Sequence, residues 1–295
     1  MDMKEWFLKY STEYFGEHVP KIEKYFQDTK EDLKKANLHF TLRQYLSMAL
    51  LSSVLTFVLV TPVVSIIFGL MSGGLSGIMG GLIAGPFIGM FLGVGVFMGF
   101  YFYPSVEIGS RRDNIDYNLP FATTYLSTVA GMGTPVAAIF KMLGEFKEYG
   151  EVSKEARKIA NDVYGFGADI DIAINRAAKR TPSEKFKDLL WGINSILTTG
   201  GDLKGFLREK ANSYMDDYRR ELDKFADTLS LLVEMYITLV IVGSVFLIII
   251  STIMSSLGTS PLMILTIQTS TIFLLLPMAS IMFILIVKTV SPMES

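Results

Sequence analysis

Residues 229–257 read LSLLVEMYITLVIVGSVFLIIISTIMSSL, a run of 29 residues with one charged side chain, Glu234. A helix that crosses the hydrocarbon layer of a membrane needs about 20 mostly apolar residues, so this run is long enough to span it. Three further runs have the same character, at 45–71, 78–103 and 262–287. The sequence therefore predicts four transmembrane helices, numbered here as spans one to four in chain order.

The composition of the chain agrees with a membrane protein. Of the 295 residues, 50% are hydrophobic and 19% are charged. The 27 lysines and arginines are balanced by 29 aspartates and glutamates, so no basic excess indicates a nucleic-acid partner. The absence of cysteine and the presence of only two histidines exclude disulfides, thiolate chemistry and a three-histidine metal centre. We expect no bound metal and no cofactor.

The positions of lysine and arginine predict the orientation of the spans. The connections at 72–77 and 258–260 carry no charge, whereas basic residues flank the opposite ends of all four spans. Because cytoplasmic flanks are enriched in lysine and arginine, we expect both termini and the long central segment to be cytoplasmic. This describes a multi-pass protein of the cell membrane.

The central segment at 104–228 contains 18 of the 27 basic residues, and its apolar residues recur at helical spacing, as in Phe186, Leu189, Leu190 and Ile193. It predicts a cytoplasmic bundle of about six helices inserted between spans two and three, and so an all-α fold. Residues 202–256 contain no proline, which predicts one unbroken helix running into span three. The predicted domains are a cytoplasmic amphipathic segment at 1–43, spans one and two at 44–103, the bundle at 104–228, spans three and four at 229–288, and a cytoplasmic tail at 289–295.

The N-terminal segment at 1–43 has two interpretations. Its mixed charge favours helices that pack on the cytoplasmic bundle, and its aromatic residues favour a helix that lies flat on the membrane surface.

No motif for catalysis is present. The sequence lacks the phosphate-binding, dinucleotide-binding, serine-hydrolase and zinc-protease signatures, so we expect no enzymatic activity and no catalytic residues. An intramembrane aspartyl protease would need two aspartates within the spans, and there are none. The nearest match, Gly200-Gly201-Asp202, is interpreted as a helix stop followed by an N-cap.

Two polar residues stand out in the spans. Glu234 lies near the cytoplasmic end of span three, where its carboxylate could reach headgroup water or a cation such as Arg43, or could serve a function. Gln268 in span four is expected to form a hydrogen bond between helices.

A stripe of small residues marks span two, with glycine at every fourth position. One face of a helix that carries only glycine lets another helix backbone approach closely. The partner is either another span of the same chain, or a second chain or the apolar helix of a client protein. The stripe comprises Gly77, Gly81, Gly85, Gly89 and Gly93.

Basic clusters in the central segment are candidates for docking a protein partner. Their alternative interpretation is that they anchor the chain at the membrane surface or are simply solvated. The clusters are Arg111 with Arg112, Arg176 with Lys179 and Arg180, and Arg219 with Arg220.

The central segment resembles the F-protein domain of type II secretion, which also occurs in the platform proteins of type IV pili and archaella and in tight-adherence C proteins. The resemblance rests on LPFATTYL at 119–126, AGMGTP at 130–135, residues 165–173, and GGDL at 200–203 with Phe206 and Leu207. Residues 33–45 resemble the approach to span one in the archaeal and tight-adherence branch. These positions are helix caps and packing residues, so they identify a fold.

The resemblance implies a non-enzymatic membrane platform. Its expected partners are a hexameric assembly ATPase and pilin-like subunits, which the platform helps to insert into a filament or secretion apparatus. Many relatives carry two such domains and this chain carries one, so we expect a homodimer or a heterodimer with a paralogue. The alternatives are a small transporter or channel, and a membrane protease that acts on prepilins.

Overall fold

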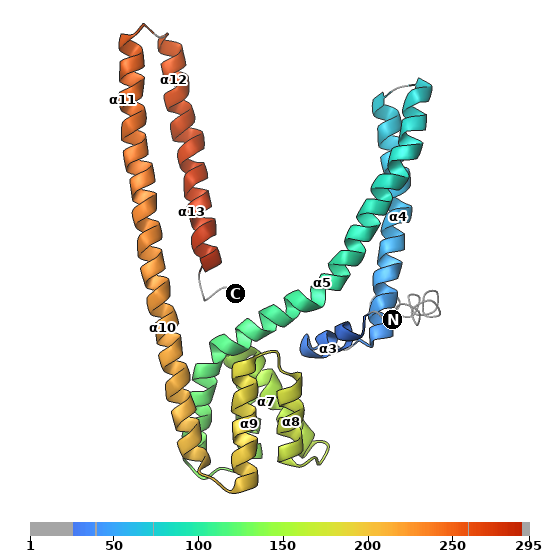
Figure 1. Ribbon diagram of the computed structural model, residues 1–295, viewed down its shortest axis with the longest axis vertical. Coiled ribbons are helices and arrows are strands. Elements are labelled where there is room, and N and C mark those ends of the chain that lie inside the picture. Colours follow the sequence, from blue (N-terminus) through green and yellow to red (C-terminus); the bar gives the residue numbers. More distant parts are fainter. Residues whose placement is uncertain (1–25, 39, 73, 259, 291–295) are drawn as a thin grey trace. The chain divides into compact units, whose positions relative to one another are not determined.

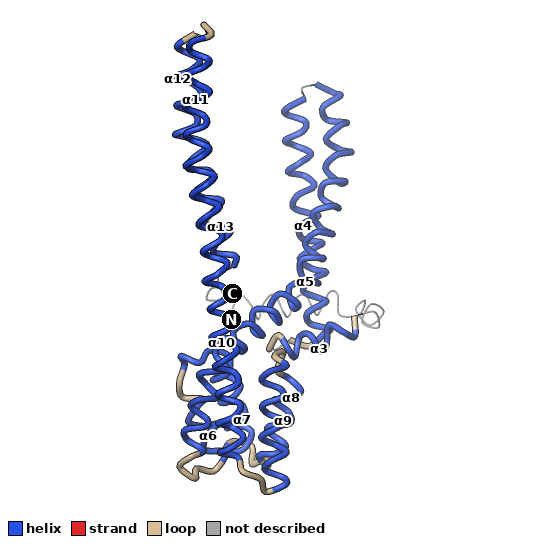
Figure 2. The backbone as a smooth tube through the Cα atoms, turned by 60° about the vertical axis from the view of Figure 1, so that its left-hand side comes forward, coloured by secondary structure: helices blue, strands red, loops and turns tan. Residues whose placement is uncertain are grey.

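The computed structural model of the protein describes residues 26–38, 40–72, 74–258 and 260–290 (Figure 1). Within these ranges the regular elements are helices and no strand occurs, which confirms the all-α class (Figure 2). The elements are α3 (Gln27–Lys35), α4 (Leu42–Ser72), α5 (Gly74–Ala130), α6 (Val136–Leu143), a 3-10 turn η1 (Lys147–Tyr149), α7 (Gly150–Tyr164), α8 (Ile170–Arg180), α9 (Glu184–Thr199), α10 (Leu203–Ile237), a π-helix η2 (Thr238–Val242), α11 (Gly243–Ser256), α12 (Pro261–Ser270), a π-helix η3 (Thr271–Leu275) and α13 (Leu276–Val290).

Four helical segments are long and apolar enough to cross a membrane, as the sequence predicts. They lie in Leu42–Phe68, Met79–Ala130, Leu203–Ser256 and Pro261–Thr289. Their apolar side chains are largely exposed in the isolated chain, for example Phe91 at 78% and Leu262 at 77%. Such surfaces are stable where hydrocarbon surrounds them.

The helix that enters span three is unbroken. Leu203–Ser256 forms one helix of 54 residues, in agreement with the prediction from the absence of proline. The π-helix η2 within it was not predicted. A π-turn adds one residue to a helical turn without ending the helix, and π-turns are common at functional sites.

The helix of span two is also unbroken, which the sequence analysis did not foresee. We placed the end of span two at Tyr103 and the start of the cytoplasmic segment at Pro104, yet α5 runs for 57 residues through Pro86, Pro104 and Pro120. A proline removes one backbone hydrogen bond and bends a helix, but neighbouring packing can hold the helix together on both sides. Two long helices therefore continue past the predicted membrane boundary.

The chain forms two compact units. The first contains residues up to Asp113 together with Gly167–Asn194, and the second contains Asn114–Phe166 together with the residues from Ser195 onward. The prediction that the helices at 104–228 form a single inserted bundle stays a prediction. Of the predicted segment at 1–43, residues 1–25 lie outside the described residues, as do residues 291–295 of the predicted tail.

In the first unit, α3 packs against α4 next to the start of span one. Its core is formed by Leu33, Leu42, Tyr45 and Leu46, all almost fully buried. A reciprocal pair of bonds caps α4, since the Thr41 amide donates to Gln44 Oε1 and the Gln44 amide donates to Thr41 Oγ1. The described part of the N-terminal segment thus packs on the first span.

In the second unit, α6 packs against α7. The Arg157 guanidinium donates from two nitrogens to the Gly144 carbonyl at the end of α6, at 3.1 and 2.6 Å. The Glu151 amide at the start of α7 donates to Asn114 Oδ1 on α5 at 2.8 Å. Gly150, which precedes it, has φ +55, a conformation that favours glycine. The Arg157 bonds thus join α7 to α6, and the Glu151 bond attaches α7 to α5.

Candidate packing and docking surfaces

The glycine stripe of span two packs against span one of the same chain. Gly81, Gly85, Gly89 and Gly93 are buried, while the residues between them on α5 are mostly exposed. A β-carbon on Gly81 would lie 2.5 Å from the Ser65 carbonyl oxygen, and one on Gly85 would lie 2.7 Å from the Thr61 carbonyl oxygen. The helices are therefore too close for any side chain at these positions.

Hydroxyl groups on α4 lie in the same interface between α4 and the glycines of α5, here called the glycine seam. Ser53 Oγ donates to the Gly93 carbonyl at 2.8 Å, a hydrogen bond between the two spans. Thr61 Oγ1 is buried opposite Gly89. Of the two interpretations of the stripe, the structure supports packing within one chain. The packing of Gly77 lies outside the described residues.

Arg111 has a different role from the other predicted docking residues. It is 4% exposed, and its Nη1 donates to the Lys35 carbonyl at the end of α3. A carbonyl at a helix C-terminus is a favourable partner for a cation because the helix dipole places negative charge there. Arg111 thus fastens α3 to α5, and we no longer count it among the surface docking candidates.

The other basic residues lie at or near the surface. Arg176 and Lys179 are exposed on α8, and Arg180 is half-buried. Arg112 pairs with Asp113 at 3.4 Å, Arg219 pairs with Asp216 at 3.8 Å, and Arg220 pairs with Asp217. Exposed pairs of this kind contribute little to stability, so their side chains remain available to a partner. For these six residues docking stays a prediction.

An aromatic joint connects the two long helices in the second unit. Tyr218 of α10 meets the rings of Tyr117 and Phe121 of α5 edge to face, with centroids 5.9 and 5.2 Å apart. Burial raises the pKa of Tyr218 above its ordinary value, and a hydrogen bond with Tyr117 acts in the same direction. The Tyr218 phenol is therefore uncharged at neutral pH. The sequence analysis did not identify these ring contacts.

The two polar residues singled out in the spans are not brought together. Glu234 is exposed on α10, and Gln268 is half-buried on α12. A bond between spans three and four comes instead from Tyr236, whose hydroxyl lies 2.9 Å from Ser280 Oγ, with the Tyr236 and Phe283 rings 4.7 Å apart. The sequence signal that could have identified this pair is one tyrosine and one serine at the same depth of adjacent spans.

Asp202 has the structural role that the sequence predicted. Its side chain accepts a hydrogen bond from the Gly205 amide at 3.0 Å, and it is the N-cap of α10. Gly200 ends the preceding segment with φ +74. This geometry explains the Gly200-Gly201-Asp202 sequence as a stop and a cap. Among the described residues, no group of three or more His, Cys, Asp or Glu could hold a metal ion.

Part of the chain, from α5 to α11, matches a known protein family. Residues 122–251, from the end of α5 to α11, match the family described as type II secretion system protein F. This segment is thus similar to type II secretion system protein F. The resemblance seen in the sequence is therefore confirmed, and the matched segment includes most of the unbroken helix that enters span three. With four apolar helices, the chain is a multi-pass membrane protein.

Relatives of the chain occur in methanogenic archaea. An uncharacterized protein of Methanocaldococcus jannaschii is 29% identical over 203 residues, which cover 65% of this chain and 33% of the relative. The flagella accessory protein J of the same organism is 28% identical over 46% of this chain and 24% of its own length. That of Methanococcus voltae is 27% identical over 49% of this chain and 26% of its own length. The aligned part thus spans a third or less of each relative. No solved structure matches the chain significantly.

The glycine seam predicts that a larger residue destabilises the fold at Gly85 but is tolerated at Gly99. Gly85→Leu should destabilise the fold by about 1–3 kcal/mol, because the side chain must push α4 away. Gly99→Leu is the matched control, since a β-carbon on Gly99 meets no atom within 4 Å. Thermal unfolding in detergent, followed by circular dichroism, compares the two variants. Equal melting temperatures of the two variants would contradict the close packing of α4 against Gly85.

The aromatic joint predicts a measurable coupling between α5 and α10. In a cycle of Phe121→Ala, Tyr218→Ala and the double variant, we expect a coupling energy of about 0.5–1.5 kcal/mol, the usual range for such ring pairs. Equilibrium unfolding of the four proteins in detergent gives this value. A control cycle pairs Phe121→Ala with Tyr164→Ala, since Tyr164 is in the same unit but contacts Lys141. Additive effects in the first cycle would show that the joint carries no coupling.

Proposed function

We propose that the chain is a membrane platform protein that transmits force from a cytoplasmic hexameric ATPase to pilin-like subunits at the membrane. Two things support this role: the match to type II secretion system protein F, and the similarity to proteins named flagella accessory protein J. The chain itself acts as a non-enzymatic scaffold in this proposal, because its sequence has no nucleotide-binding motif.

The observation that carries the proposal is the continuity of two helices. α5 and the α10–η2–α11 helix each pass without a break from a charged segment into a span. At a rise of about 1.5 Å per residue, a movement at one end of such a helix reaches the other end without being absorbed in a loop. The joint of Tyr117, Phe121 and Tyr218 couples the two helices in the second unit.

The exposed cations of α8 are the proposed contact with the ATPase. Arg176 and Lys179 lie one turn apart on the same exposed face, and the buried face of the same helix contains Ala173, Ile174, Ala177 and Ala178. A rigid helix that presents positive charge suits an acidic surface on the motor.

The working unit in this proposal contains two copies of the chain, or this chain and a paralogue. The reason is that the aligned segment covers only 24–33% of the archaeal relatives, whose greater length leaves room for a second set of helices. The bilayer surrounds the spans of both chains.

The proposed ATPase contact is tested by reversing charge. Arg176→Glu with Lys179→Glu should weaken binding to the purified motor by tenfold or more, about 1.4 kcal/mol or greater, and abolish any change in its ATP turnover. The control is Lys154→Glu with Arg208→Glu, which changes the total charge equally at two other exposed cations. Pull-down and ATP hydrolysis in the same detergent provide the measurements. If both double variants bind as the unmodified chain does, α8 is not the contact.

The proposed orientation is tested with single cysteines, because the chain has none of its own. Ser260→Cys, in the connection between spans three and four, should react with a membrane-impermeant maleimide added to intact cells. Lys179→Cys should react only after the membrane is opened. The opposite pattern would invert the topology and place the ATPase contact on the wrong side.

A further inference from the structure

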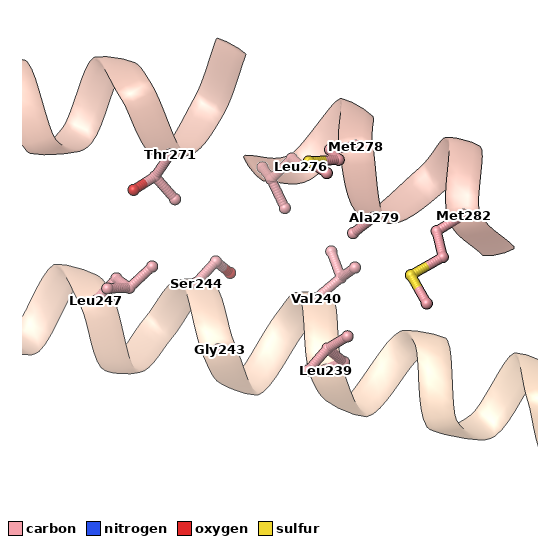
Figure 3. A pocket seen from close by; sticks show the side chains of 10 residues that line it. All are labelled: Leu239, Val240, Gly243, Ser244, Leu247, Thr271, Leu276, Met278, Ala279 and Met282. Atoms are coloured by element: carbon pink, nitrogen blue, oxygen red, sulfur yellow. The ribbon is translucent and has the colours of Figure 1, made fainter. Parts of the chain in front are cut away.

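Spans three and four enclose a groove that no function discussed so far explains. The groove has a volume of about 360 Å³ and lies between α10–η2–α11 on one side and η3–α13 on the other. Figure 3 shows Val240 and Leu247 on the first helix facing Leu276 and Ala279 on the second. Gly243 forms part of the wall, and a β-carbon there would meet no atom within 4 Å.

The groove is apolar throughout. Its two hydroxyl groups are already bonded to the backbones of their own helices, since Ser244 Oγ donates to the Ile241 carbonyl and Thr271 Oγ1 donates to the Ile267 carbonyl, both at 2.9 Å. Every other lining side chain is aliphatic or a methionine. Nothing in the groove would recognise a headgroup or any other charged ligand, so its ligand must be a hydrocarbon.

The groove lies at the middle of the membrane. Gly243 is the central residue of the run at 229–257, so equal lengths of helix lead from it to the two surfaces. This is the depth at which the free ends of lipid chains lie. A hydrocarbon chain can enter sideways at this depth without moving its headgroup from the surface.

The two helices contact each other near both ends of the groove, which favours a lipid chain over a protein helix as its occupant. On the cytoplasmic side Tyr236 bonds to Ser280 and packs on Phe283. On the other side α11 packs against α12. A helix is about 10–12 Å wide with its side chains and would need open ends to lie in the groove.

The volume also favours a lipid chain over a single inserted side chain. A water molecule occupies about 30 Å³ of liquid, and a methylene group is of similar size, so the groove holds roughly a dozen such groups. One leucine or phenylalanine from another protein would leave most of this space empty, and empty space loses the packing contacts of its lining.

Both π-helices line the groove, at staggered positions. Val240 of η2 faces Ala279 of α13, and Thr271 of η3 lies opposite Leu247 of α11 (Figure 3). Each π-helix widens its own helix by one residue beside the groove. η3 ends two residues before Pro277, whose missing N–H explains the irregular turn there. No proline lies near η2, so an occupant of the groove is a physical reason for that turn to persist.

We infer that the groove between spans three and four is a mid-membrane binding site for one hydrocarbon chain of a membrane lipid, and that an occupied groove stabilises the two π-helices. The site is independent of the proposed function, because lipid binding requires neither a motor nor a filament subunit.

The test uses the full chain in nanodiscs that contain a phospholipid with a diazirine at the end of one acyl chain. After illumination and peptide mass spectrometry, labels should concentrate on groove residues such as Leu247 and Met282. Gly243→Leu fills the groove and should remove most of this labelling. Gly95→Leu is the matched control, since it adds the same side chain to a span face that meets no atom within 4 Å.

A second variant and a second readout keep the result decisive. Ala279→Leu fills the groove from the opposite wall and serves if Gly243→Leu does not fold, as judged by circular dichroism. Native mass spectrometry after detergent extraction should show one more retained lipid on the unmodified chain than on either groove variant. Labels that are spread evenly around the spans, or that both groove variants leave unchanged, would overturn the site. So would an unlabelled groove covered by another protein chain.

Discussion

The constraint on which the structure depends is that hydrocarbon offers no hydrogen-bond partner to a peptide group. Every N–H and C=O at membrane depth must be satisfied within the chain, and a continuous helix does this residue by residue. Breaking a helix inside the membrane would expose unpaired groups, so irregularities appear as π-turns or bends instead. The passage of α5 through Pro86, and the two π-helices of spans three and four, follow from this constraint.

Because every span must be a helix, the pairing of the spans is determined by how well their surfaces pack together. The first hairpin uses close approach, because four buried glycines on α5 bring the backbones of α4 and α5 together. The second hairpin uses bulky residues and a polar contact between Tyr236 and Ser280, and it leaves a groove at its middle. Two solutions to the same packing problem thus produce one hairpin with closely packed backbones and one hairpin with space for a ligand.

The parts outside the spans are organised around the long helices. Asn114 attaches α7 to α5, Arg157 joins α7 to α6, and Arg111 attaches α3 to α5. The Asn114 and Arg111 contacts each join a short element to a long one, through amide or charged groups that are partly buried. A force applied to the short elements would therefore reach the long helices through directional bonds, which suits the platform role that we propose.

Four spans, the all-α class and the unbroken helix at 203–256 could be predicted from the sequence, because run length, helical spacing and the absence of proline are local properties. The N-cap role of Asp202 was predictable for the same reason. The continuation of α5 through Pro104 was not, since local rules place a boundary at a proline and only neighbouring contacts decide whether the helix bends or ends. Arg111 was predicted to be a surface cation, because its hydrogen-bond partner, the carbonyl of Lys35, is 76 residues away in the sequence. Three other features could not be predicted for the same reason: the partner of the glycine stripe, the ring contacts of Tyr218 and the groove beside Gly243. Each depends on which surfaces meet across large separations in the chain, and a pattern along one helix specifies the shape of a surface without specifying what lies against it.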